Sequence, residues 1–476
     1  MNKVKFTEKI GYGFGDMASS MFWKVFSYYL PFFYSNVFGL TLDQVALLLI
    51  VTRVWDAVSD PMMGVIADRT STRWGKYRPY LLFMAIPFAI CGVLLFTTPS
   101  WGPQAKLIYA YASYILMMTV YTGINVPYGA MLGVMTDNSA EKTSLSSYRM
   151  FFAYIGSFVV LFLWEPMVNQ FGKAMTLQGS WQAAMTVVAV ICVALFGLTF
   201  KLTREMVSTL ASGSVLKDLK ALLRNAPFWI LVCAALCSNL FMTLRGSTVA
   251  YFFKDYIPQG AHLVVGSLSV LFYAGLFLSV GEIANMAGVA FAAPLSNRIG
   301  KKSTFLCSML VLALLSVVFF FIPVTPLGFL LMLLLQVLIC VFTGVISPLL
   351  WSMYADVADY SEHKTGSASI GLIFSSSSMA QKFGSAFGGA MVMWLLAAFG
   401  YQTVEGSIQT AEAINGLNLL MSVIPAGVAV VALIIMCLYP LTTSKMNEIE
   451  ADLKAQRKWD FFRVSCQGFA ARSTST

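Results

Sequence analysis

The stretch Ile50-Val51-Thr52-Arg53-Val54-Trp55-Asp56-Ala57-Val58-Ser59-Asp60-Pro61-Met62 carries two carboxylates inside an otherwise apolar segment. Asp56 and Asp60 are four residues apart, so on a helix they share one face. Ionised acids at membrane depth are costly and usually have a function. The stretch therefore predicts a membrane-spanning helix with a functional site inside it.

The composition of the whole chain supports a membrane protein. Of its 476 residues, 58% are hydrophobic and 11% are charged, which is far more apolar than an ordinary soluble protein. Apolar runs long enough to cross about 30 Å of hydrocarbon recur from end to end. The eight cysteines lie mostly within those runs, a pattern typical of packing residues. We expect no disulfide framework, no structural metal and no cofactor.

Basic residues are concentrated in every second link between the apolar runs. The positive-inside rule then predicts a multi-pass protein of the cell (inner) membrane with both termini in the cytoplasm. The net charge of +9 follows the side of the membrane rather than one face, which excludes nucleic acid as a partner. The basic links contain Arg69, Arg73, Lys76 and Arg78; Lys142; Arg204, Lys217, Lys220 and Arg224; Arg298, Lys301 and Lys302; and Lys364.

The apolar runs predict an all-α membrane protein with twelve transmembrane helices. We divide the chain into an N-terminal six-helix bundle (1–201), a cytoplasmic linker (202–226), a C-terminal six-helix bundle (227–440) and a cytoplasmic tail (441–476). The predicted helices are 8–37, 42–67, 79–98, 105–134, 143–170, 180–201, 227–255, 262–293, 303–322, 327–354, 367–399 and 415–440.

Equivalent links in the two halves share a short motif. Asp68 and Arg69 precede Gly75-Lys76 in the first half, and Asn297-Arg298 precedes Gly300-Lys301 in the second. Two pseudo-symmetric six-helix bundles with such loops are typical of the major facilitator fold. That fold binds its substrate near the membrane midplane, between the halves.

Several motifs resemble one branch of that superfamily, the glycoside-pentoside-hexuronide:cation symporters of the melibiose permease type, over nearly the whole chain. The resemblance implies cation-coupled uptake of a sugar by a protein surrounded by membrane lipid, and we expect a functional monomer. The motifs are Tyr12-Gly13-Phe14-Gly15-Asp16, Arg53 to Pro61, Arg73-Trp74-Gly75-Lys76-Tyr77-Arg78-Pro79, Asn125 to Gly129, Asp356 to Tyr360, and Lys382 to Gly389.

The acid pair itself indicates cation coupling. Two carboxylates this close in a low dielectric repel each other, so one must bind a proton or a cation must lie between them. The alternative is a structural ion pair with Arg53 or Lys382. The resemblance assigns Asp56, Asp60, Thr122 and the Ser59 position to the cation site. An amide is usual where this chain has Ser59, so loss of a carbonyl ligand favours H⁺ over Na⁺.

Lys382 is predicted near mid-membrane, about 22 Å along its helix from the cytoplasmic end. One hypothesis is that Asp56, Asp60 and Lys382 sum to a charge of −1, so that a single H⁺ or Na⁺ neutralises them. The alternative is that Lys382 binds the substrate directly.

The resemblance places substrate binding at Ser20, Asn125, Arg149, Ser378 and Lys382. Ser20 and Asn125 stand where melibiose carriers have acids, so melibiose itself is disfavoured. A hexuronide and a neutral pentoside or β-glycoside both remain open. For Arg149 the alternative is a side chain that extends to the cytoplasmic surface. Trp351 could stack on a sugar ring, and its alternative is packing.

Charged residues at the cytoplasmic ends of the two halves are candidates for an inner gate. We expect Asp68, Arg69, Arg73 and Lys76 to face Asp356 and Asp359, with ion pairs that open during transport. The alternative is that these charges only set the topology.

Other classes of function fit the sequence less well than symport. A proton-coupled exporter of amphipathic compounds shares the fold, but it would have a more uniformly apolar cavity than Asn125, Arg149 and Lys382 provide. An intramembrane enzyme or a sensor is disfavoured, because His262 and His363 lie far apart and no signalling domain is attached.

Overall fold

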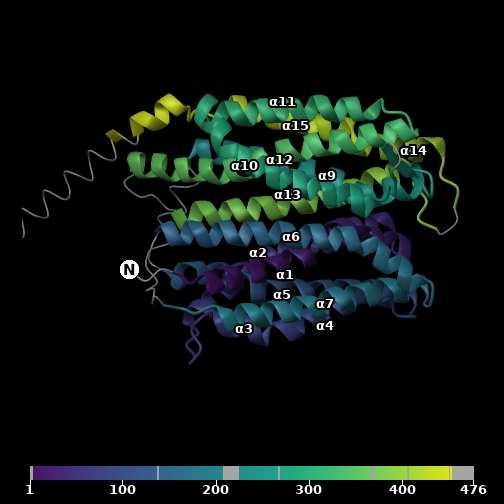
Figure 1. Cartoon of the computed structure of the whole chain (residues 1–476), viewed down its shortest axis with the longest axis horizontal. Helices are drawn as coiled ribbons and strands as arrows, with labels where there is room; N and C mark the ends of the chain where they lie inside the picture. The colour runs from purple at the N-terminus through teal and green to yellow at the C-terminus, as the bar shows by residue number, and fades with distance from the viewer. Residues whose placement is uncertain are drawn as a thin grey trace, which may run out of the picture.

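The computed structural model describes residues 4–136, 139–206, 225–265, 268–365, 370–404, 407–449 and 451–452. The predicted linker 202–226 and tail 441–476 therefore lie largely outside the described residues. Within the described part, the chain is built of long helices that run roughly parallel to one another (Figure 1).

The N-terminal helices cover the residues up to 202. Their bounds are α1 (Phe6–Phe32), the π-helical segment η1 (Phe33–Phe38), α2 (Leu42–Arg69), α3 (Arg78–Phe83), α4 (Ala85–Leu95), α5 (Pro103–Met135), α6 (Ser139–Gly172) and α7 (Leu177–Leu202).

The C-terminal elements begin at residue 226. They are α9 (Ala226–Tyr251), the π-helical segment η2 (Phe252–Tyr256), the strands β1 (His262–Val265) and β2 (Leu268–Leu271), α10 (Ala274–Ile299), α11 (Lys301–Phe320), α12 (Pro326–Thr365), α13 (Ile370–Ala398), α14 (Ala411–Met421) and α15 (Val423–Cys437).

The two sets of helices occupy opposite sides of the molecule (Figure 1). Within the first set α1 packs on α6 and α7, and α2 packs on α5; within the second, α10 packs on α12 and α9 packs on α13 and α15. The sets meet where α2 contacts α13, α6 contacts α10 and α1 contacts α9. Figure 1 also shows the N-terminus and the last described segment at the same end of the helices.

Eight of the described helical segments are long and apolar enough to cross a membrane. They lie in α5, α6, α7, α9 with η2, α10, α11, α12, and α14 with α15. Helices α1, α2 and α13 are outside this group, and each contains charged residues, among them Lys24, Asp56 and Lys382. These segments establish an integral membrane protein.

Two predicted helices are interrupted, and a proline explains each break. The predicted helix 79–98 divides at Met84, because Pro87 lacks an amide hydrogen and its ring clashes with the carbonyl of Phe83. The predicted helix 415–440 divides at Ser422 for the same reason, with Pro425 four residues after Met421. The carbonyl that Pro425 leaves free, that of Met421, accepts a hydrogen bond from buried Arg245.

The predicted helix 262–293 is wrong in its first part. Residues His262–Val265 and Leu268–Leu271 form an antiparallel hairpin, and helix α10 starts only at Ala274. The segment contains three valines, Val264, Val265 and Val270, and their β-branched side chains favour strands. Apolar character alone does not distinguish a short strand pair from the start of a buried helix.

Candidate functional site

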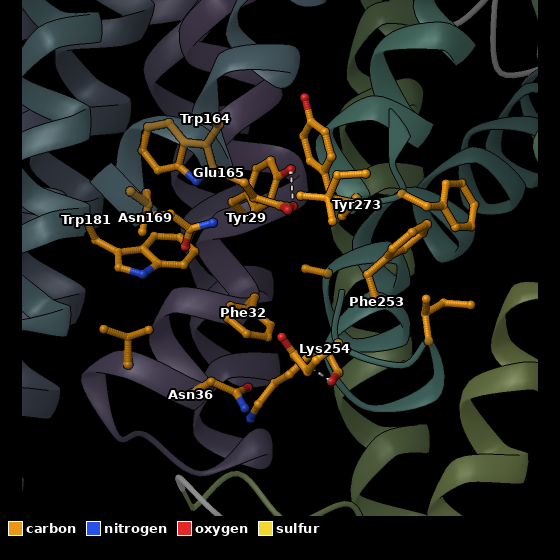
Figure 2. A pocket seen from close by; sticks show the side chains of 18 of the residues that line it. Tyr29, Phe32, Asn36, Trp164, Glu165, Asn169, Trp181, Phe253, Lys254 and Tyr273 are labelled. Carbon is orange, nitrogen blue, oxygen red and sulfur yellow. Dashed lines mark hydrogen bonds between the residues drawn. The ribbon is translucent and has the colours of Figure 1, made fainter. Parts of the chain in front are cut away.

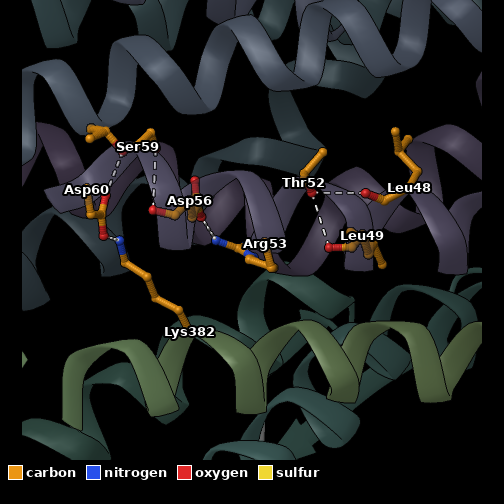
Figure 3. A network of polar contacts seen from close by, with 9 residues as sticks. Leu48, Leu49, Thr52, Arg53, Asp56, Ser59, Asp60 and Lys382 are labelled. Carbon is orange, nitrogen blue, oxygen red and sulfur yellow. Dashed lines mark hydrogen bonds and ion pairs between the residues drawn. The ribbon is translucent and has the colours of Figure 1, made fainter. Parts of the chain in front are cut away.

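Asp56 forms an ion pair with Arg53 of its own helix. The Arg53 guanidinium lies 2.9 Å from Oδ2 of Asp56, and both side chains are buried (Figure 3). The same guanidinium lies 4.8 Å from the centre of the Trp23 ring, a favourable position for a cation over an aromatic face. Within the described residues, the other oxygen of Asp56 is buried without a hydrogen-bond partner.

Asp60 joins the two sets of helices. Its Oδ1 accepts a hydrogen bond from the Thr122 hydroxyl of α5 at 2.8 Å, and its Oδ2 pairs with the Lys382 ammonium of α13 (Figure 3). The Asp60 and Lys382 side chains are each 28% exposed, whereas that of Asp56 is 2% exposed. Asp60 is therefore the carboxylate of the pair that water or an ion can reach.

The charge balance of this cluster differs from the sequence hypothesis. Asp56, Asp60 and Lys382 sum to −1, but Arg53 is bound to Asp56, and the four charges sum to zero. The ion pairs weighed as a structural alternative are both present.

Ser59 lies between the two acids but faces the backbone. Its hydroxyl donates to the carbonyl oxygen of Asp56 at 3.4 Å, and the residue is buried (Figure 3). Ser59 is thus placed in the cluster without supplying it with an ionic contact.

Arg149 is paired with a carboxylate that sequence reasoning missed. Its Nε lies 2.9 Å from Oδ2 of Asp16 in α1, and its guanidinium lies 5.0 Å from the centre of the Tyr128 ring. The pair is partly exposed, at 31% for Arg149 and 17% for Asp16. The available signal was Asp16 itself, an acid inside the first apolar run.

The other predicted substrate residues fall into two groups. Asn125 accepts a hydrogen bond from Ser19 at 3.3 Å, with half-buried Ser20 next in the chain, so these polar groups lie where α1 meets α5. Ser378 is exposed on α13, one helical turn before Lys382. Trp351 packs edge-on to Tyr354, with ring centres 6.0 Å apart, against the apolar core of the C-terminal helices. That contact matches its packing alternative.

The structure gives two of the predicted gate residues, Asp356 and Arg73, a side-chain partner within their own set of helices. Asp356 of α12 binds Lys301 of α11 at 2.6 Å. Arg73 stacks on Trp74 at 4.5 Å, and the backbone amide of Lys76 donates to Glu205, a residue that sequence reasoning missed. Arg69 is exposed, Asp359 lies in α12, and the side chain of Asp68 lies outside the described residues.

A further ion pair between the two sets was also missed from the sequence. Lys24 of α1 lies 2.5 Å from Oε1 of Glu282 in α10 and 3.3 Å from the Tyr28 hydroxyl. Glu282 is buried, and its Oε2 has no partner among the described residues. A cavity of about 40 Å³ beside it, lined by Arg245, Gln336 and Thr343 among others, has room for water.

Close contacts between the two sets also occur at the end of the helices remote from the N-terminus. Ser35 in η1 bonds to Tyr251 at 2.7 Å, and Ser247 donates to the carbonyl of Ser27 at 3.1 Å. Tyr273, just before α10, donates to the carbonyl of Phe162 in α6 at 3.0 Å. The N-terminal and C-terminal helices are therefore in contact at that end. The Asp60–Lys382 pair lies farther from that end, along α2 and α13.

Together, apolar helices and buried charges that join two sets of helices define a polytopic membrane transporter. The profile of the family described as MFS/sugar transport protein matches residues 11–443, and the chain belongs to this family. The predicted membership of the glycoside-pentoside-hexuronide type is thereby confirmed, as is the prediction that the protein is a transporter and not an enzyme.

Similar proteins support this assignment. The chain is 36% identical over 463 residues to "Putative glycoside/cation symporter YagG" of Escherichia coli (strain K12), which covers 96% of each chain. It is 33% identical over 429 residues to the isoprimeverose transporter of Lactiplantibacillus pentosus, covering 88% of this chain and 85% of that one. The crystal structure of the nucleoside transporter NupG matches the fold with a TM-score of 0.63, at 14% identity, over 90% of this chain and 98% of that chain.

Proposed function

We propose that this protein couples the downhill movement of H⁺ or Na⁺ to the transport of a sugar by alternating access. The observation that carries the proposal is Asp60, which is shared between Thr122 of α5 and Lys382 of α13. A cation at Asp60 would release Lys382 and so loosen a contact between the two sets of helices. Cation binding and conformational change are then linked through one carboxylate.

The architecture belongs to the same proposal. It consists of twelve spans arranged as two six-helix bundles, 1–201 and 227–440, joined by the linker 202–226 and followed by the tail 441–476. Two features of the structure support this architecture (Figure 1). The N-terminal and C-terminal helices lie on opposite sides of the molecule, and the first and last described segments lie at the same end of the helices. By the positive-inside rule, the basic links support a cytoplasmic location for that end. The proposal also includes the cell (inner) membrane as the location and a monomer as the functional unit.

The charges of the candidate substrate site favour a neutral sugar. Arg149 is neutralised by Asp16, so it is not available for a hexuronide carboxylate without loss of an ion pair. Hydroxyls of a neutral glycoside or pentoside can instead share donors and acceptors with Asp16, Arg149 and Asn125. The printed names of two relatives, a glycoside/cation symporter and an isoprimeverose transporter, agree with this choice, whereas a third, "Glucuronide carrier protein homolog", names a hexuronide.

Uptake measured in membrane vesicles tests the function directly. Labelled β-glycosides, pentosides and hexuronides are offered with an imposed pH gradient, an imposed Na⁺ gradient or neither. We expect uphill accumulation of a neutral sugar with one of the two gradients. Equal uptake with and without both gradients would contradict coupling, and net extrusion from loaded vesicles alone would identify the exporter.

Arg149→Ala tests the substrate site. We expect the KM for sugar to rise at least about tenfold, because a charged donor to a hydroxyl contributes about 1.5–3 kcal/mol. The matched control is Lys9→Ala, which removes another ion pair between α1 and α6, that of Lys9 with Glu141 at 2.8 Å. A KM that stays at the wild-type value in Arg149→Ala would remove Arg149 from the site.

Ser59→Asn tests the choice of ion. An asparagine at this buried position places a carbonyl oxygen near Asp56 and Asp60, and carbonyl oxygens are good ligands for Na⁺. We expect uptake to become stimulated by an Na⁺ gradient at constant pH. Ser59→Ala, which adds no ligand, serves as the control. The same response to Na⁺ in both variants would contradict the argument for H⁺ in the natural chain.

A further inference from the structure

A second cavity lies apart from the cation cluster and from the candidate substrate residues. It has a volume of about 570 Å³ and opens between α1, α6 and α7 on one side and η2, the β1–β2 hairpin and the start of α10 on the other (Figure 2). We call it the hairpin pocket. Sixteen residues of α6 separate Arg149 from Glu165 in its wall, about 24 Å at helical rise.

The lining of the hairpin pocket combines aromatic rings with uncharged and charged hydrogen-bonding groups. Phe32 and Trp181 stack at 5.9 Å between ring centres, and Trp164 packs edge-on to Trp181 at 5.7 Å. Asn36, Asn169 and Lys254 present polar ends around these rings (Figure 2). Aromatic faces against the C–H face of a ring, with amides for its hydroxyls, are the chemistry that recognises a sugar.

The indole Nε1 of Trp164, a fully buried residue in the wall, makes no hydrogen bond within the described residues. Because this nitrogen has no accessible surface, a ligand in the hairpin pocket would reach it only after the wall moves. In contrast, Glu165 accepts a hydrogen bond from the Tyr29 hydroxyl at 3.0 Å.

The hairpin pocket lies beside a closed contact between α6 and α10. Tyr273 donates to the carbonyl of Phe162 at 3.0 Å, and a Cβ atom on Gly275 would lie only 2.4 Å from the carbonyl oxygen of Leu161. The backbones there are in direct contact, so a sugar cannot pass between them. A molecule in the hairpin pocket is thus held outside this contact until α6 and α10 separate.

We propose that the hairpin pocket is a second sugar-binding site, which holds a neutral glycoside on the side opposite the N-terminus before the α6–α10 contact opens. The inference rests on the proposed function, because the ligand is the transported sugar. A cavity of 570 Å³ is within the range of pockets that enclose small-molecule ligands. The substrate set around Arg149 is then reached in a later step.

Sidedness of the kinetics tests the second site. Asn169→Ala removes an exposed amide from the pocket, and Trp181→Leu removes an aromatic face. For 4-nitrophenyl β-glycosides in oriented vesicles, each variant is expected to raise the KM about tenfold from the pocket side and to leave it unchanged from the opposite side. Gln170→Ala, the neighbouring exposed position outside the pocket, is the control. Equal changes on both sides would overturn the proposal.

Binding stoichiometry separates failure of this site from failure of the proposed function. Equilibrium dialysis of the same glycoside against purified protein is expected to give two sites in the wild type and one in Arg149→Ala. If the wild type transports sugar normally but has a single site, and that site is lost in Arg149→Ala, only the second site would be overturned. If glycerophosphate binds in the hairpin pocket and the glycoside does not, the second sugar site is overturned in favour of a site for a lipid headgroup. No binding or transport of any sugar would overturn the proposed function itself.

Discussion

Replacement of Asp60 by asparagine is expected to abolish uphill accumulation of sugar while equilibrium exchange continues. Asparagine keeps the size of the side chain and an oxygen for Thr122, but it removes the charge that Lys382 and a coupling cation share. A potential of about 100 mV is worth about 2.3 kcal/mol per charge, which corresponds to about 50-fold accumulation. In the variant we expect the inside-to-outside ratio to fall to about 1.

The measurement compares accumulation under an imposed gradient with counterflow in its absence. Asp43→Asn is the matched control, because Asp43 is an exposed acid in the first turn of the same helix. Its accumulation is expected to match the wild type. Asp60→Asn vesicles that still concentrate sugar would assign coupling elsewhere, first to buried Asp56. Loss of counterflow as well would show that Asp60 is needed for sugar binding or for movement of the loaded protein, and not for coupling alone.

Replacement of Lys24 by methionine is expected to produce the largest loss of stability. The change leaves Glu282 buried without the ammonium that now lies 2.5 Å from it. Removal of one partner from a buried ion pair costs about 3–5 kcal/mol, whereas replacement of both by apolar residues is often nearly neutral. We therefore expect the double variant Lys24→Met/Glu282→Leu to recover most of the lost stability.

Thermal unfolding of the purified protein in detergent measures this difference. Lys9→Met is the control, because its partner Glu141 is 15% exposed whereas Glu282 is 4% exposed, and the loss of stability is expected to be smaller. A melting temperature for Lys24→Met equal to that of Lys9→Met would contradict the assignment of a buried lock. A double variant no more stable than Lys24→Met would show that the two residues act separately.

The Lys24–Glu282 pair has a functional consequence. It joins α1 to α10, whereas Asp60–Lys382 joins α2 to α13, so both pairs connect the N-terminal and C-terminal helices. Rocking of one set against the other must lengthen or break such pairs, since packed helices change position as rigid bodies. A cation that competes for Asp60 relieves one of them. The double variant is accordingly expected to exchange sugar faster than the wild type under the same conditions.

Much of the fold could be predicted because apolar length is a local property. Every long apolar run was recognised, and most helix ends were within a few residues of those observed. Three errors occurred where a local competitor acted: Pro87 and Pro425 break helices, and the β-branched segment around Val264 and Val270 forms a hairpin. The predicted helix 327–354 was also too short, since α12 continues to Thr365.

The candidate site was predictable only in part. Unusual residues can be recognised from the sequence, and Asp56, Asp60 and Lys382 are charged where the membrane disfavours charge. Their partners cannot be recognised in this way, because pairing depends on which helix faces meet. Asp16 and Lys24 were visible as charges in the first apolar run, but nothing local shows that one meets Arg149 and the other Glu282.

The sequence by itself determined that this protein crosses a membrane, that it belongs with sugar transporters, and that an acid pair lies within its second helix. Those conclusions depend on composition, spacing and motif, which are written along the chain. Only the tertiary structure decided that Arg53 neutralises Asp56, that Lys382 crosses to Asp60, and that a polar, aromatic pocket forms beside the hairpin. Charge balance and cavities arise where distant segments pack together, and the distance between two side chains in space is not encoded in their separation along the chain.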